Sequence, residues 1–229
     1  NAPIFGNLHI ALTNLSLYSI FVVLIIVGFH VYGDNDNKII PNSWSIFFES
    51  SYASLNTMVR DQINANNEKY FPFIYSIFFY ILIANLVSNV PYSFAVTASG
   101  VVSLGLSLTV FIGVTLLALS IHGIRFFAFF IPSGTPLALV PLLVLIELVS
   151  YLARAVSLGV RLFANITAGH TLLKILSTYL FKLFTGNVIV AVLTLIPFAI
   201  FLALVGLELA VSLIQAFVFT LLVCSYIKD

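Results

Sequence analysis

The chain has 229 residues, of which 61% are hydrophobic and only 7% are charged. Because about a quarter of the residues in soluble globular domains are charged, this composition excludes a soluble domain and indicates a polytopic membrane protein. Nine basic residues against eight acidic ones leave a formal net charge of +1, which excludes a strongly basic surface for nucleic acid. The single cysteine, Cys224, excludes a disulfide framework and a thiolate metal site.

The first two thirds of the chain contain three apolar runs of ordinary span length and one amphipathic segment. Residues 8–32 are long enough as a helix to cross a hydrocarbon layer of about 30 Å. Residues 43–60 place apolar and polar side chains at helical spacing, which predicts an amphipathic helix on the membrane surface. Residues 70–90 and 96–121 are the second and third predicted spans.

The third predicted span contains Gly100, Gly105 and Gly113 at near-helical spacing. Small residues in one row allow two helix backbones to approach closely in a membrane. We therefore expect another helix to pack tightly against these glycines.

The last two apolar runs, residues 137–184 and 187–227, exceed the length of an ordinary span. A straight helix over the second run measures roughly 60 Å, twice the hydrocarbon thickness. Each run is therefore either two spans or one strongly tilted helix. Since the second run holds no solvated loop and backbone in hydrocarbon must keep its hydrogen bonds, we favour two long tilted helices forming a hairpin.

The predicted fold is thus an all-α polytopic membrane protein, a single membrane domain over residues 1–229, with about five membrane helices and one surface helix. The positive-inside rule sets its orientation. One side holds five basic residues and the other holds one: Lys38, Arg60, Lys69, Arg125 and Lys228 against Lys182. This distribution places the N-terminus outside.

Charged and polar side chains interrupt the first long tilted helix at regular intervals. Glu147, Arg154 and Arg161 are seven residues apart, so they lie along one slowly drifting stripe of a helix. Asn165 lies one turn beyond Arg161, whereas His170 lies on nearly the opposite side of a straight helix. A guanidinium at bilayer depth costs about 2.5–3.5 kcal/mol on insertion scales, so we expect Arg161 to face a compensating partner.

The second long tilted helix carries Glu208 and Gln215, again seven residues apart. Glutamate and histidine can exchange protons when their surroundings shift them, whereas arginine stays charged. We therefore expect Arg161 to repel protons and to hold a mobile carboxylate ionised. The predicted orientation places Glu147 toward the inside and both His170 and Glu208 toward the outside.

A structural role remains open for several of these residues. Arg161 and Glu208 can form a plain ion pair that locks the two helices together, although that would leave the other buried polar groups as an unexplained cost. His30 and His122 fit the ends of spans better than ligand sites. Arg154 can face lipid headgroups or a partner subunit, and no transport role is assigned to it.

Two segments, "ELVSYLARAVSLGVRLFANITAGH" and "LVGLELAVSLIQAFVFTLL", make the chain resemble the mitochondrial form of the ATP synthase subunit a family, over essentially its whole length. The resemblance implies a stator with two long, nearly horizontal helices beside a rotating ring of proteolipid subunits, each bearing one carboxylate at mid-membrane. It also implies that Arg161 is essential and separates two offset aqueous half-channels.

The same resemblance implies the remaining site residues. Glu147 belongs to the inner half-channel, His170 and Glu208 belong to the outer one, and Asn165 and Gln215 line the space beside the arginine. Bacterial relatives carry the acid and the histidine with these two positions exchanged, so "GH" at residues 169–170 and "LELA" at residues 207–210 resemble the mitochondrial branch. A proton would enter past Glu208 and His170, ride on a ring carboxylate for almost a full turn, and leave past Glu147.

The implied location is the mitochondrial inner membrane, with the N-terminus in the intermembrane space and the C-terminus in the matrix. The implied partners are the ring subunits, peripheral-stalk and accessory membrane subunits, lipids, and protons as the transported ion, with no nucleic acid, cofactor or metal. The chain starts at Asn1 rather than at a methionine, which suggests the mature form.

Two other classes of membrane protein also place charged groups at mid-depth. A secondary ion or solute transporter usually shows internal repeats, and the two halves of this chain show none. A haem-bearing respiratory subunit needs histidine pairs at matched depth, and no paired spacing connects His9, His30, His122 and His170.

Overall fold

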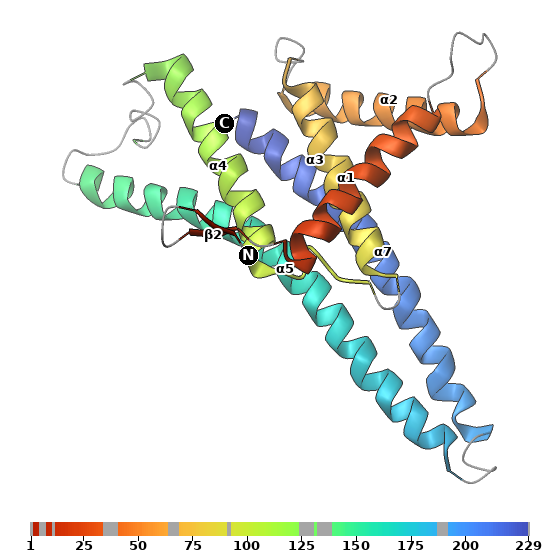
Figure 1. The fold of residues 1–229 in the computed structure, drawn as a ribbon. Helices are drawn as coiled ribbons and strands as arrows, with labels where there is room; N and C mark the ends of the chain where they lie inside the picture. The colour runs from red at the N-terminus through yellow and green to blue at the C-terminus, as the bar shows by residue number, and fades with distance from the viewer. Residues whose placement is uncertain are drawn as a thin grey trace. The chain divides into compact units, whose positions relative to one another are not determined.

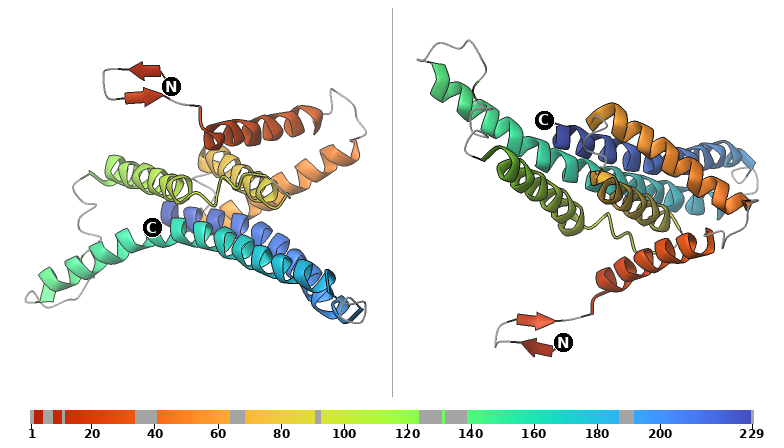
Figure 2. Two further views of the ribbon diagram at one scale, coloured as in Figure 1. Left: turned by 60° about the horizontal axis from the view of Figure 1, so that its bottom comes forward. Right: turned by 90° about the horizontal axis from the view of Figure 1, so that it is seen from above.

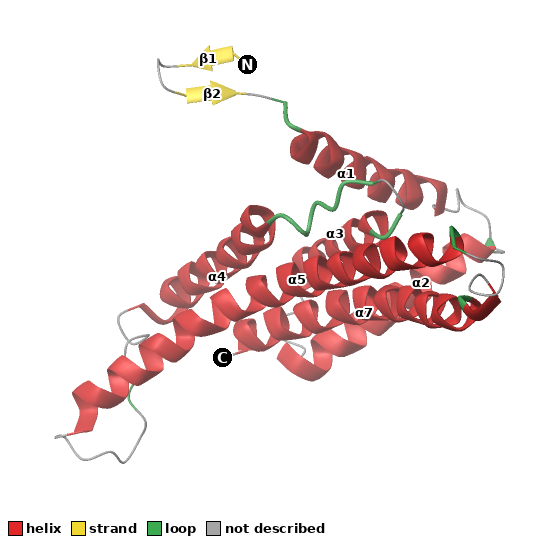
Figure 3. Ribbon diagram, turned by 90° about the horizontal axis from the view of Figure 1, so that it is seen from below, coloured by secondary structure: helices red, strands yellow, loops and turns green. Residues whose placement is uncertain are grey.

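The computed structural model describes residues 2–4, 8–10, 12–33, 41–63, 69–90, 93–123, 131, 139–186 and 192–228. These residues form six long helices and one short two-stranded sheet (Figures 1 and 3). The helices are α1 (Asn14–Gly33), α2 (Ser43–Ile63), α3 (Phe71–Ser88), α4 (Gly100–His122), α5 (Val140–Phe184) and α7 (Leu195–Lys228). All except α2 are long and apolar enough to cross a membrane. The predicted fold class is therefore confirmed.

The N-terminal sheet was not expected from the sequence. Strands β1 (Ala2–Ile4) and β2 (Leu8–Ile10) pair antiparallel, so part of the first predicted span is strand. Helix α1 begins only after Thr13, because Thr13 and Ser16 cap its first turn reciprocally. The amide of Ser16 donates to Thr13 Oγ1 at 3.4 Å, and the amide of Thr13 donates to Ser16 Oγ at 3.1 Å.

The chain divides into two compact units, and α5 contributes to both. The first unit comprises Asn1–Thr97 and Ile166–Asp229, and the second comprises Ala98–Asn165. The first unit therefore holds α1, α2, α3, α7 and the later part of α5. The second unit holds α4 and the earlier part of α5.

The core of the first unit lies where α2, α3 and α7 meet. Its buried side chains are Leu55, Val59, Phe71, Ile74, Phe79 and Cys224. His30 of α1 packs beside this core, with its ring 4.8 Å from the Phe48 ring and its Nε2 3.1 Å from the Tyr75 hydroxyl. His30 therefore joins α1 to α2 and α3.

In the first unit, the later part of α5 and α7 form an antiparallel pair (Figures 1 and 2). The Phe184 ring lies 6.3 Å from the Phe198 ring, and His170 lies opposite Glu208. Residues that are later in α5 thus face residues that are earlier in α7, as in the predicted hairpin. At about 1.5 Å per residue, the 45 residues of α5 cross a layer of roughly 30 Å only when strongly inclined.

The second unit corrects the expectation about glycines in part. A Cβ atom on Gly100 would be in ordinary contact with Phe163 of α5 at 3.8 Å, whereas one on Gly105 or Gly113 would meet nothing within 4 Å among the described residues. The close helix approach lies instead at Gly159 of α5, where a Cβ atom would stand 2.5 Å from Ser107 Oγ and 3.1 Å from Leu104 Cα. The glycine that brings these two helices together is thus in α5 rather than in α4.

Several residues used in the sequence analysis cannot be placed. Lys38, Arg125, residues 137–138 and residues 187–191 lie outside the described part of the chain, as do the side chains of His9, His122 and Lys228. The orientation that rests on the basic residues therefore stays a prediction.

Candidate functional site

Helix α7 carries a buried polar face in an otherwise apolar sequence. Glu208, Ser212 and Gln215 follow one another at intervals of four and three residues, so they share one side of the helix. All three are buried. Ionisable and amide side chains are costly within membrane helices and mark functional sites, so this face is the starting point for the site.

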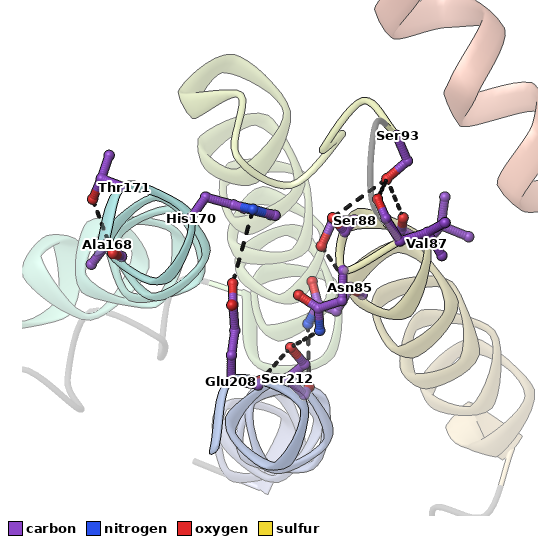
Figure 4. A network of polar contacts seen from close by, with 11 residues as sticks. Asn85, Val87, Ser88, Ser93, Ala168, His170, Thr171, Glu208 and Ser212 are labelled. Carbon is purple, nitrogen blue, oxygen red and sulfur yellow. Dashed lines mark hydrogen bonds and ion pairs between the residues drawn. The ribbon is translucent and has the colours of Figure 1, made fainter. Parts of the chain in front are cut away.

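Glu208 lies opposite His170 of α5, and their side chains point toward each other (Figure 4). His170 Nδ1 and Glu208 Oε1 are 4.0 Å apart. The imidazole is 38% exposed and the carboxylate is 10% exposed. Since 4.0 Å exceeds a hydrogen-bond length, the two groups lie within ion-pair range without a direct hydrogen bond.

Gly169 gives the carboxylate its place against α5. A Cβ atom at this position would lie 2.7 Å from Glu208 Oε1 and 2.9 Å from Glu208 Cδ. Both distances are shorter than real Cβ contacts. Any larger residue at position 169 would therefore displace the carboxylate.

Helix α3 adds two asparagines that the sequence analysis missed. Asn89 Nδ2 donates to Ser212 Oγ at 2.8 Å, and Asn85 Nδ2 donates to the Ser212 backbone oxygen at 3.3 Å. Ser212 Oγ in turn donates to the Glu208 backbone oxygen at 2.8 Å. Asn85 and Asn89 are four residues apart in the apolar run "ILIANLVSNV", and that spacing was the available signal.

A pocket of about 460 Å³ opens between these helices. Its polar lining comes from Ser88 at the end of α3, Asn89 and Ser93 just after it, His170 of α5 and Glu208 of α7. A water molecule takes about 30 Å³ in the liquid, so the pocket has room for several. Nε2 of His170 and Oδ1 of Asn89 are buried and have no protein hydrogen-bond partner among the described residues.

The other predicted site residues lie on the part of α5 that belongs to the second unit. Arg161 and Arg154 are exposed, and Glu147 and Asn165 are partly buried. The buried stripe of this helix runs instead through other positions, including Leu158 and Leu162.

The structure thus brings His170 and Glu208 together and keeps Gln215 on the face of Glu208. The roles predicted for Arg161, Glu147 and Asn165 stay predictions. Within the described chain, no group of three or more His, Cys, Asp or Glu side chains is placed to hold a metal ion.

Comparison with known proteins identifies the family. The family model described as ATP synthase A chain matches residues 16–228. An ATP synthase subunit a of Mycosarcoma maydis is 59% identical over all of this chain and 90% of that relative. The subunit a of Emericella nidulans is 50% identical over all of this chain and 90% of its own length, and that of Yarrowia lipolytica is 50% identical over 96% and 87%. The chain therefore belongs to the ATP synthase A chain family, the proton-conducting, non-catalytic stator subunit of the synthase membrane sector.

Proposed function

We propose that the pocket lined by His170 and Glu208 is the outer half-channel of this stator, through which protons reach the carboxylates of a rotating proteolipid ring. The observation that carries this proposal is the His170–Glu208 pair, 4.0 Å apart at the edge of a 460 Å³ pocket. A carboxylate and an imidazole can each take up and release a proton. Gln215, on the same face as Glu208, extends the polar lining further along α7.

The inner half-channel includes Glu147 on α5, and protons leave through it after they have travelled on the ring. The distribution of basic residues, which places Glu147 toward the inside, supports this assignment. One acid thus serves each side of the membrane.

Arg161 keeps the two half-channels from joining. Its guanidinium stays charged at every physiological pH, so it repels protons and favours the ionised form of a ring carboxylate that passes it. A neutral carboxyl group can face lipid, whereas a carboxylate there carries a large desolvation penalty. The exposure of Arg161 in the isolated chain supports a ring-facing position, and Asn165 one turn away adds a hydrogen-bonding group beside it.

The membrane is the mitochondrial inner membrane, with the N-terminus in the intermembrane space and the C-terminus in the matrix. The order of the motifs around His170 and Glu208 supports the mitochondrial branch, and the distribution of basic residues supports the orientation. The other partners are peripheral-stalk and accessory membrane subunits, together with lipids.

Glu208→Gln in the complete synthase tests the outer half-channel. The amide keeps the size of the side chain but cannot carry a proton, so proton-driven ATP synthesis per assembled complex in inner-membrane vesicles should fall about tenfold or more. Assembly should survive, because glutamine fills the same space.

The matched control is Glu49→Gln, which alters an exposed acid of α2 and should leave synthesis unchanged. Normal proton flux in Glu208→Gln would remove Glu208 from the outer half-channel.

A further inference from the structure

Ser212 of α7 receives two hydrogen bonds from asparagines at the C-terminal end of α3. Its hydroxyl accepts from Asn89 Nδ2 and donates to the backbone oxygen of Glu208. Its own backbone oxygen accepts from Asn85 Nδ2, whose side chain lies beside Ser212 in Figure 4. Ser212 is 1% exposed and Asn85 is fully buried. The link between α3 and α7 is thus shielded from water and lies one helical turn from the carboxylate of Glu208.

The chemistry of these atoms fixes the orientation of both asparagine amides. The hydroxyl proton of Ser212 is already donated to Glu208, so the atom of Asn89 that faces the hydroxyl must be a donor, the NH₂ group. A backbone oxygen can only accept, so Asn85 must also present its NH₂ group to Ser212. Both amide carbonyls therefore point away from Ser212.

Asn89 also connects Ser212 to the pocket. It lines the same pocket as His170 and Glu208. Its Oδ1 is buried without a hydrogen-bond donor from the described residues.

We propose that Asn89 and Ser212 form a hydrogen-bonded clasp that positions Glu208 for proton uptake. The clasp holds α7 at one rotation about its axis, so the carboxylate faces His170. Asn89 and Ser212 are positioning residues, since neither gains nor loses a proton. This proposal rests on the proposed outer half-channel.

A set of variants in the complete synthase tests the clasp. Ser212→Ala removes the acceptor, Asn89→Leu removes the donor at similar size, and the double variant removes both. Each single variant should lower ATP synthesis per assembled complex several-fold, and the double variant should be no slower than the slower single variant, because both changes break the same bond. Ser212→Thr retains the hydroxyl and should recover most of the activity.

The dependence of synthesis on outer pH separates positioning from general weakening. If Ser212 positions Glu208, Ser212→Ala should alter the environment of the His170–Glu208 pair and shift the dependence of synthesis on pH. A structural defect alone would lower the rate by the same factor at every pH. The control is Thr220→Val on α7, which removes another buried hydroxyl that donates to a backbone oxygen one turn back, that of Ala216. It should leave the profile unchanged.

An unshifted profile in Ser212→Ala, or multiplicative losses in the double variant, would overturn the clasp. Glu208→Gln measured alongside keeps the two proposals apart. If Glu208→Gln is slow while Ser212→Ala and Asn89→Leu behave as the unaltered protein, only the clasp fails. If Glu208→Gln is itself normal, the outer half-channel fails and the clasp fails with it.

Discussion

Gly169 decides how closely the carboxylate of Glu208 can approach α5. A methyl group at this position would overlap Glu208 Oε1 and Cδ, and the flexible carboxylate can move away more easily than the helix can. We therefore predict that Gly169→Ala leaves the protein folded but slows proton uptake, because the carboxylate is moved relative to His170. The measurement is proton-driven ATP synthesis per assembled complex, with an expected loss of about tenfold.

Gly28→Ala of α1 is the control for this variant, since a Cβ atom there meets nothing within 4 Å in the described part of the chain. It removes the same conformational freedom without touching the pocket. Full activity of Gly169→Ala would show that the position of the carboxylate is not set by this glycine.

The sequence predicts the chemistry of single residues better than their hydrogen-bond partners. Glu208 and His170 can be identified because ionisable groups stand out in apolar helices. The bond between Asn89 and Ser212 joins residues 123 positions apart, and no local pattern encodes which polar groups meet across helices. The role of Gly169 likewise depends on how closely α7 approaches α5, which the sequence of α5 alone does not show.

At the scale of elements, α4 and the earlier part of α5 can pack closely because Gly159 has no side chain to keep them apart. A Cβ atom there would lie 3.1 Å from Leu104 Cα, and a backbone atom cannot turn aside. Gly159→Ala should therefore separate the helices and cost about 1–3 kcal/mol of packing free energy, which exceeds the gain of about 1 kcal/mol in helix propensity. The measurement is the thermal stability of the purified complex, with release of the subunit on heating as the readout.

Adding Ser107→Gly to Gly159→Ala tests the source of this cost. The second change removes the hydroxyl that lies 2.5 Å from the new methyl group but leaves Leu104 Cα in place, so we expect only partial recovery. Gly105→Ala, whose Cβ meets nothing within 4 Å among the described residues, should not lower stability. Unchanged stability in Gly159→Ala would contradict this packing.

Helices and their order were predictable because long apolar runs have few alternatives in a membrane. The hairpin of α5 and α7 followed from the lack of a solvated loop in residues 187–227. The N-terminal strands were not predictable, since residues 2–4 and 8–10 continue the apolar character of the first span. The reciprocal cap of Thr13 and Ser16 is the local signal that places the helix start later.

At the scale of the whole molecule, membership in the ATP synthase A chain family replaces the transporter and haem-protein interpretations. In the function proposed above, the proton leaves an acid of this chain for a moving acid on a ring subunit and returns to a second acid of the chain. Arg161, between the two acids, is proposed to carry the positive charge that prevents a leak.

Arg161 therefore carries the central claim. The most direct measurement compares passive proton leak and coupled ATP synthesis in inner-membrane vesicles that contain the unaltered protein, Arg161→Lys or Arg161→Ala. The account predicts that both variants assemble but lose coupled synthesis, and that Arg161→Ala, which has no positive charge, also raises the passive leak. Coupled synthesis retained in both variants, with no increase in leak, would contradict it.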